Sequence, residues 1–212
     1  MNNIELKNSD KLRTYKFNKD EKELFLSLPS DYREFLKRSN GGMVVEPSNC
    51  SFKIDAINPS EDELSESTNS VEEFFTWLSY ENELPQKELI GPKSILHQHY
   101  DTYQEEEFLP GNAIVIARCV HNSLIVLSLN EDDYGSIYFW EKSWQSPKYE
   151  AFFKKRILEV SAKYEDIKEI LSKPQHPDFG KACDALNYAT LIKVSTSFSD
   201  FINDLHCSTT SP

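Results

Sequence analysis

The chain has 212 residues, of which 27 % are charged, and a formal net charge of −12. This length indicates one domain, and the excess of acidic residues argues against nucleic-acid binding, because phosphates would repel the protein. No apolar run reaches the ~18 residues of a membrane span and no secretion signal is visible, so we expect a cytoplasmic protein. The charge would attract a basic protein partner, although it would equally serve to keep the protein soluble and monomeric.

The N-terminal part begins with a polar segment over residues 1–20, followed by a short helical face over residues 21–28. Pro29 suits the first turn of a helix, and Asp31 is placed to cap that helix. Gly41-Gly42 supplies the left-handed conformation in which many helices end. Spacing of i, i+3 and i+4 predicts one buried face on this helix, made of Tyr32, Phe35 and Leu36.

A strand, a loop and a second helix are expected next. Residues 51–57 alternate between polar and apolar side chains, which predicts a half-buried strand. Residues 58–70 are polar and acidic, and we expect a loop there. Ser70 and Glu73 have the spacing of a capping box, which predicts a helix that begins at this point. The apolar face of that helix would consist of Val71, Phe74, Phe75 and Leu78.

Three short apolar runs in the middle of the chain predict three successive strands, at residues 113–117, 124–129 and 136–140. β-Branched and aromatic residues dominate these runs, and polar or glycine-bearing connections separate them. The first two runs hardly alternate, so both faces of those strands should be covered. Together the runs predict an α+β domain with a buried antiparallel sheet.

The C-terminal part of the chain is expected to contain a long helix, then a strand, then a final short helix. Apolar residues recur at spacings of four and three over residues 153–171, which predicts a long helix that begins at Pro147 and ends at Lys173-Pro174. Residues 188–194 predict a last strand. Ser197 is placed to cap a final helix. The inner face of the final helix would consist of Phe198, Phe201, Ile202 and Leu205.

The four cysteines, which form no C-x-x-C pair, are far apart in the sequence: Cys50, Cys119, Cys183 and Cys207. This spacing favours reduced thiols in a cytosolic protein over a disulfide framework or a zinc knuckle. The cysteines are therefore expected to be free.

Three stretches, in this order and at these distances, resemble the motifs of one family. They are Leu28–Leu36 running into Asn40-Gly41-Gly42, Leu109–Asn112 with Gly135–Trp140 after the central strands, and Ser197–Leu205. The first is similar to a leucine-proline, tyrosine, phenylalanine-leucine, asparagine-glycine-glycine opening. The second resembles a central sheet with a tyrosine-phenylalanine-tryptophan ending, and the third a closing serine-phenylalanine helix. The family is the SUKH superfamily, named for fungal cell-wall-assembly regulators and related bacterial proteins.

The resemblance implies an α+β fold in which helices pack around a central, mostly antiparallel sheet. We expect a single SUKH-like domain over residues 21–207, with a long helical insertion over residues 147–187 and a tail over residues 208–212. The turn over residues 118–123 lacks the glycine that the family often has there, so a partner contact at this turn does not carry over from the resemblance.

The resemblance also implies a non-enzymatic, protein-binding role without a cofactor. Many bacterial members resemble immunity proteins, which bind a cognate toxin and block it. Such toxins are often nucleases with basic grooves for phosphates, and an acidic binder complements such a groove. The alternative from the same fold is an intracellular scaffold or regulatory adaptor.

The acidic runs beside the central strands, together with a tryptophan after them, are the candidate partner-binding residues: Glu105, Glu106, Glu107, Glu131, Asp132, Asp133 and Trp144. A basic toxin domain would bind them in a salt-sensitive manner. Charge runs often only face water, so a solvated surface is the competing interpretation. Tyr138 is a further candidate anchor, whereas Trp140 is expected in the core.

A hydrolase or metal-binding protein is a third hypothesis, and it depends on the histidines. His97 and His99, with Asp101 and His121, are the only metal-like grouping, but no further ligand pattern accompanies them. Cys119 near His121 would be a nucleophile and its base, yet neither lies in an activating motif. We therefore expect no metal site and no catalytic residue.

Overall fold

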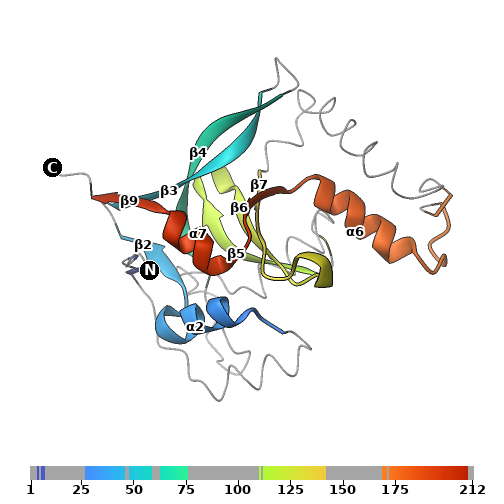
Figure 1. The fold of residues 1–212 in the computed structure, drawn as a ribbon, viewed down its shortest axis with the longest axis horizontal. Coiled ribbons are helices and arrows are strands. Elements are labelled where there is room, and N and C mark those ends of the chain that lie inside the picture. The colour runs from blue at the N-terminus through green and yellow to red at the C-terminus, as the bar shows by residue number, and fades with distance from the viewer. Residues whose placement is uncertain are drawn as a thin grey trace, which may run out of the picture.

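One antiparallel sheet organises the chain in this computed structural model, which describes residues 4, 6–7, 27–45, 48–58, 63–75, 110, 112–141, 169–170 and 172–209 (Figure 1). Within those residues the sheet has nine strands, and its main path runs β1-β2-β4-β5-β6-β7-β8. Strand β3 pairs with β4 on one side and with β9 on the other. The strands are β1 (Leu6–Lys7), β2 (Gly42–Val44), β3 (Ser48–Asn58), β4 (Glu63–Phe74), β5 (Ala113–Cys119), β6 (Leu124–Ser128), β7 (Ile137–Trp140), β8 (Ile192–Ser195) and β9 (His206–Thr209).

Three helices accompany the sheet in the described part of the chain, so the coarse α+β prediction is confirmed (Figure 1). They are α2 (Ser30–Ser39), α6 (Phe179–Ala189) and α7 (Phe198–Asp204). None of the described helices has the length and apolar character that would let it cross a membrane.

The three central strands form where the apolar runs predict them. Every residue of β6 is buried, and the exposed fractions of Ile125, Val126 and Leu127 are 0 %. In β5 only Arg118 is less than fully buried. Both faces of these strands are covered, which explains why polar and apolar residues do not alternate in their sequences.

Aromatic rings join the helices to the sheet in the core. Phe198 of α7 packs against Tyr32 and Phe35 of α2, with ring centroids 4.9 and 5.0 Å apart. Phe52 of β3 lies 5.8 Å from Phe139 of β7 and 5.4 Å from the Phe201 ring of α7. The contact between β3 and β7, which are distant in strand order, requires the sheet to curl around this core.

The helix ends are fixed by capping and by one long-range hydrogen bond. Ser197 accepts a hydrogen bond from the Asp200 N–H at 3.0 Å, which confirms it as the cap of α7. Asp31 does not cap α2 from the preceding position, because the helix already begins at Ser30. Its carboxylate instead accepts the Ser199 N–H of α7 at 2.8 Å and so ties the two helices together. At the end of α2, Asn40 and Gly41 take positive φ angles of 45° and 74°.

The prediction of a helix from Ser70 is wrong, because this segment belongs to β4. The register pairs Val71 with Cys119, and Phe74 with Ala117, on the β5 side, with a bulge before Glu73. The spacing of Ser70 and Glu73 imitates a capping box, but serine, threonine and asparagine dominate the preceding residues and are weak helix formers. Pairing on both sides of the strand therefore decided the structure.

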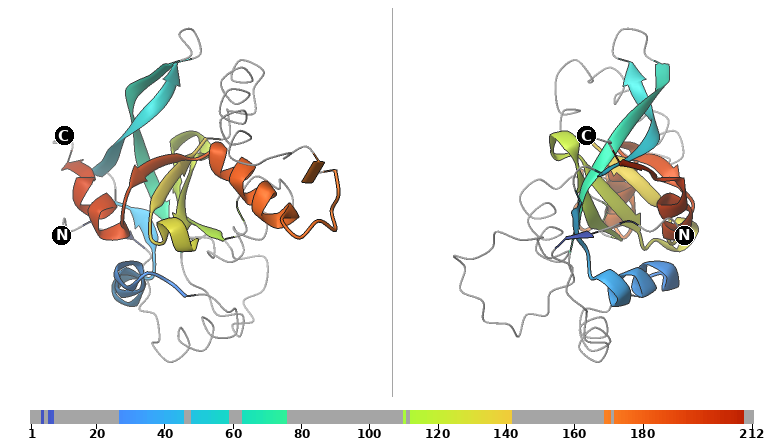
Figure 2. Two further views of the ribbon diagram at one scale, coloured as in Figure 1. Left: turned by 45° about the vertical axis from the view of Figure 1, so that its right-hand side comes forward. Right: turned by 90° about the vertical axis from the view of Figure 1, so that its left-hand side faces the viewer.

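The acidic loop expected at residues 58–70 is also wrong. Strand β3 extends to Asn58 and β4 begins at Glu63, so most of the segment is paired backbone. Residues 52–58 and 63–69 pair only with each other among the described residues, and we call them the β3–β4 arm. Both views of Figure 2 show this hairpin projecting beyond the remaining strands.

The expectation of free cysteines is wrong for two of the four, so the cysteines no longer support a cytosolic location. Cys50 and Cys207 are opposite each other in the pairing of β3 with β9 and form a disulfide bond. They are 157 positions apart in the sequence, so only the strand register brings them together. Ser208 and Thr209, expected in the tail, continue β9. The disulfide lies at the base of the β3–β4 arm.

The long helical insertion at residues 147–187 is not confirmed. Most of this segment lies outside the described residues; Glu169 and Ile170 are helical, and the chain then turns before α6 begins at Phe179. Helix α6 contains Tyr188 and Ala189, so the last strand begins at Ile192, four residues later than predicted.

The β5–β6 connection contains no glycine, and two other residues supply its backbone conformation. His121 and Asn122 have φ angles of 61° and 58°, and the Ser123 N–H donates to the Val120 carbonyl at 3.3 Å. Two successive positive φ angles define the type I′ turn, whose twist matches that of the strands it joins. This turn lies within the 3-10 segment η1 (Val120–Asn122).

Candidate functional site

An acidic turn between β6 and β7 carries three of the residues predicted to contact a partner. It is the 3-10 segment η2 (Glu131–Asp133), in which Glu131 and Asp132 are exposed. The backbone closes around it, since the Gly135 N–H donates to the Ser128 carbonyl at 2.9 Å. Gly135 takes a φ of 85°, which only glycine adopts without strain. The turn therefore presents two carboxylates to solvent on a well-defined backbone.

Asp133 has a different role from its two neighbours. Ser128 donates its hydroxyl proton to Asp133 Oδ1 at 2.6 Å, and the Tyr138 hydroxyl donates to Oδ2. Because Ser128 has only that proton, the Tyr188 hydroxyl, 2.6 Å away, must donate to Ser128. Asp133 thus fastens the acidic turn to β6, to β7 and, through Ser128, to α6.

Both tyrosines of this network keep their protons at neutral pH. Burial raises the pKa of Tyr138 well above its ordinary value, and the hydrogen bond to Asp133 raises it further. Burial likewise raises the pKa of Tyr188 to about 12. Their rings also pack edge to face, with centroids 5.6 Å apart. The network consequently retains its donors and holds the turn in place, and Tyr138 is a structural residue more than a surface anchor.

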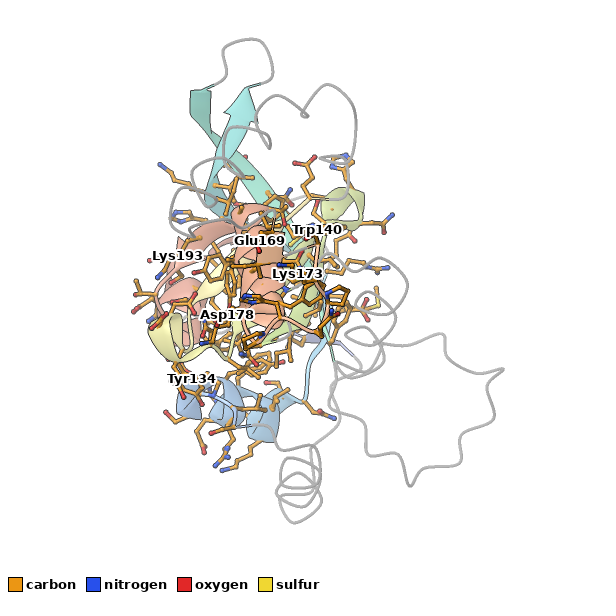
Figure 3. The ribbon with its side chains drawn as sticks, turned by 90° about the vertical axis from the view of Figure 1, so that its right-hand side faces the viewer. Tyr134, Trp140, Glu169, Lys173, Asp178 and Lys193 are labelled. Carbon is orange, nitrogen blue, oxygen red and sulfur yellow. A yellow bond between two sulfur atoms is a disulfide. The ribbon has the colours of Figure 1, made fainter. Side chains whose placement is uncertain are left out.

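Tyr134 follows the acidic turn directly, and sequence reasoning did not single it out. Its exposed fraction is 45 %, which makes it one of two large exposed hydrophobic residues in the described part of the chain. Its hydroxyl donates to the Ser27 carbonyl at 2.8 Å, so the ring is held beside α2 (Figure 3). Tyrosine is one of the residues that most often carry binding energy at protein interfaces. The aromatic residue immediately after the acidic run was the signal.

A second charged group lies between β4 and β5. Arg118 Nη2 is 3.1 Å from Glu73 Oε2, and Arg118 Nε is 3.5 Å from Glu72 Oε2. The Glu73 side chain is only 6 % exposed, whereas Arg118 and Glu72 are about 40 % exposed (38 % and 42 %). A buried carboxylate needs such a partner, so this group stabilises the strand pair.

The remaining partner-binding candidates cannot be placed. Glu105, Glu106, Glu107 and Trp144 lie outside the described residues. Trp140, which closes β7, is 4 % exposed, and its predicted place in the core is confirmed.

The residues of the metal and nucleophile hypotheses are not brought together in the described part of the chain. His97 and His99 lie outside it, and His121 is exposed on the β5–β6 turn. Within the described residues no three histidine, cysteine or acidic side chains converge as metal ligands. Cys119 is buried, and this burial, with a smaller effect of Glu72, raises the pKa of its thiol. A thiol kept protonated in this way is a poor nucleophile.

Comparison with known protein families matches residues 16–204 to the SMI1 / KNR4 family (SUKH-1). Searches of the curated proteins and of the solved structures found no match. The family match covers most of the chain. It includes the first two stretches that carry the sequence resemblance and all of the third except Leu205. The curled antiparallel sheet, the helix before it and the closing α7 are the elements to which those stretches contribute. The chain therefore belongs to the SMI1 / KNR4 family (SUKH-1).

Proposed function

We propose that this protein is an immunity protein, which binds a cognate nuclease toxin domain and neutralises it without catalysing a reaction. Membership of the SMI1 / KNR4 family supports a regulatory or toxin-immunity role. The observation that carries the proposal is the acidic turn, where Glu131 and Asp132 stand exposed beside Tyr134 on a backbone fixed through Asp133.

Charge supports a basic partner. The groove of a nuclease must attract phosphates, and a protein with a net charge of −12 is attracted to the same groove. Long-range attraction of this kind mainly accelerates association, and it weakens as salt screens the charges. A cytoplasmic location would bring the protein to a toxin that acts on nucleic acid inside the cell.

Rigidity supports the acidic turn as the point of contact. A partner that binds flexible carboxylates must first order them, and this costs free energy for each side chain that is immobilised. Here the hydrogen bonds of Asp133 to Ser128 and Tyr138 already fix the backbone that carries Glu131 and Asp132. Little further ordering of the backbone is then needed on binding.

The test is coexpression with the protein encoded by the gene immediately upstream. We expect that protein to stop cell growth when expressed alone and to be harmless when this chain is present, with a stable complex of the two on gel filtration. If the upstream product neither inhibits growth nor binds, the immunity role is wrong and the adaptor role of the same fold takes its place.

The double variant Glu131→Lys, Asp132→Lys tests the acidic turn within that complex. We expect the association rate at low salt to fall about ten-fold, and the difference to shrink in high salt. The matched control is Glu169→Lys, Asp178→Lys, which reverses two exposed charges near α6 (Figure 3). Equal losses in both variants would mean that only the net charge matters and that the turn is not the contact.

A further inference from the structure

The last strand of the sheet, β9, lies beyond the family domain. The family match ends at residue 204, whereas β9 runs from His206 to Thr209 (Figure 1). The helix before it, α7, is already anchored in the core through the buried side chains of Phe198, Phe201 and Ile202. The core of the domain is therefore closed before β9 begins. We call residues 206–209 the C-terminal strap.

The non-covalent attachment of the C-terminal strap is slight. Among the described residues the strap pairs with β3 alone, in a register that runs from Ser48 opposite Thr209 to Ser51 opposite His206. The side chains of His206 and Cys207 are exposed. The Ser51 hydroxyl donates to the His206 carbonyl at 3.5 Å, which is the outer limit of a hydrogen bond. Two short strands are marginally stable without a packed face, so the strap depends on its covalent bond.

That covalent bond is the disulfide between Cys50 and Cys207, and its two ends differ in exposure. Cys50 is 1 % exposed and also pairs with Val71 of β4, which fixes it within the sheet. Cys207 is exposed. Access to the sulfur atom is one of the conditions that set the rate of thiol–disulfide exchange. A reductant in solution can therefore attack the bond at its Cys207 end.

We propose that the Cys50–Cys207 disulfide is a redox-operated latch, which holds the C-terminal strap on β3 under oxidising conditions and releases it under reducing ones. The reductant is a dithiol, and one of its thiolates attacks Cys207 Sγ. The bond to Cys50 Sγ breaks, and Cys50 leaves as a thiolate that takes up a proton. The second thiolate of the reductant then displaces Cys207. Two electrons have passed to the protein, which holds two thiols, and the reductant has become a disulfide.

Release of the strap alters one edge of the sheet and leaves its neighbours in place. Residues 48–51 of β3 lose their partner, but Cys50 and Ser51 keep their pairing with β4. Disulfides persist in oxidising compartments and are reduced in the cytosol. The state of the strap would thus depend on the compartment that the protein occupies. The acidic turn lies elsewhere, between β6 and β7, so this device is separate from the proposed toxin contact.

Hydrogen exchange without denaturant, before and after addition of dithiothreitol, tests the latch. We expect reduction to accelerate exchange of the amides of residues 206–209 by about 100-fold or more, to nearly the rate of an unstructured peptide. Cys119 reports on the rest of the domain, because it is a free cysteine with an exposed fraction of 0 %. In the reduced protein, iodoacetamide should modify Cys207 at least about 100 times faster than Cys119. Oxidised glutathione should restore the protection of the strap once dithiothreitol is removed.

Two variants separate loss of the latch from loss of a cysteine. Cys207→Ser should show the released strap without any reductant, since the bond cannot form. The matched control, Cys183→Ser, removes a cysteine that is not in the disulfide and should respond to dithiothreitol as the original protein does.

Three results would overturn the latch. Reduction that occurs only after a denaturant is added would make the bond a permanent staple. Strap amides that stay protected after complete reduction would show that pairing with β3 is sufficient to hold the strap. Modification of Cys119 as fast as Cys207 would show that reduction unfolds the whole domain. Each result leaves the immunity role untouched, because none of the measurements involves the toxin.

Discussion

The central strands and the β3–β4 arm belong to one sheet but are stabilised in different ways. In β6 every residue is buried, so burial of apolar surface holds the strand in place. In the arm, Glu66 is paired with Asp55 and Ser65 with Ala56. Main-chain hydrogen bonds between the two strands must therefore supply most of the stability of the arm. A two-stranded hairpin is marginal by itself, so the arm depends on how its base is anchored. The difference shows that strands of one sheet can be stabilised by different interactions, apolar burial at the centre and main-chain pairing in the arm.

The largest expected effect is on the rigid side of this comparison, at Gly41. A Cβ atom at this position would lie 2.4 Å from the Phe75 carbonyl oxygen and 2.5 Å from that of Phe74. Its φ of 74° is also unfavourable for other residues. We expect Gly41→Ala to lower the free energy of unfolding by about 3–5 kcal/mol, as measured by urea denaturation.

Gly180→Ala is the matched control, because nothing lies within 4 Å of the new Cβ and the residue is helical. It should raise the stability by about 0.5–1 kcal/mol. Similar effects of the two substitutions would contradict a steric role for the Phe74 and Phe75 carbonyl groups at Gly41.

The second prediction concerns the anchor of the arm. Cys207→Ser removes the disulfide to Cys50, and we expect it to lower the free energy of unfolding by about 2–4 kcal/mol. Amides of β6, which exchange through global unfolding, should be accelerated by this loss of global stability, whereas those of β9 and of the base of β3 should exchange faster still through local opening. Addition of dithiothreitol should destabilise the original protein and have no further effect on the variant. A disulfide that contributes nothing would leave both proteins equally stable.

The third prediction concerns the hydrogen-bond network that fixes the acidic turn to the central strands. Tyr188→Phe removes one of the two donors to the Ser128 hydroxyl oxygen, and the Asn130 N–H at 3.1 Å remains. We expect a loss of about 1 kcal/mol in the free energy of unfolding. Tyr134→Phe removes a more exposed hydrogen bond, to Ser27, and should cost about 0.5 kcal/mol. Equal losses of stability in the two variants would show that the hydrogen bond of Tyr188 contributes no more to stability than the exposed one of Tyr134.

The same network predicts a loss of stability in alkali. Burial raises the pKa of Tyr188 from about 10 to about 12 in the folded protein. The unfolded chain therefore releases this proton first, so the contribution of Tyr188 is complete below about pH 10 and is lost as the pH rises towards 12. Unfolding by urea at a series of pH values should show a steeper alkaline decline for the original protein than for Tyr188→Phe.

Strong local patterns were sufficient to predict the centre of the molecule. The apolar runs of β5, β6 and β7, the spacing of Tyr32, Phe35 and Leu36, and the cap at Ser197 each depend on residues close in sequence. The family motifs fall on the same elements.

The features that sequence reasoning missed depend on partners distant in the chain. The sequence of β4 from Ser70 onwards resembles the start of a helix. This segment is a strand because it pairs with β3 and β5. Cys50 meets Cys207 through a register that no local pattern reveals. The acidic run was found, but the separation of Asp133 from its exposed neighbours required the positions of Ser128 and Tyr138.

Two contacts join the N-terminal part of this fold to its C-terminal part, and they affect how quickly a new chain becomes active. The hydrogen bond from Ser199 to Asp31 spans 168 positions, and the Cys50–Cys207 pair spans 157. Topologies dominated by such distant pairings fold in milliseconds to seconds, and formation of a disulfide takes a further seconds to hours. In the role proposed here, newly made chains would therefore respond late to a toxin that has already arrived. Protection would depend on a standing supply of mature molecules, so slow turnover of the folded protein matters as much as its affinity.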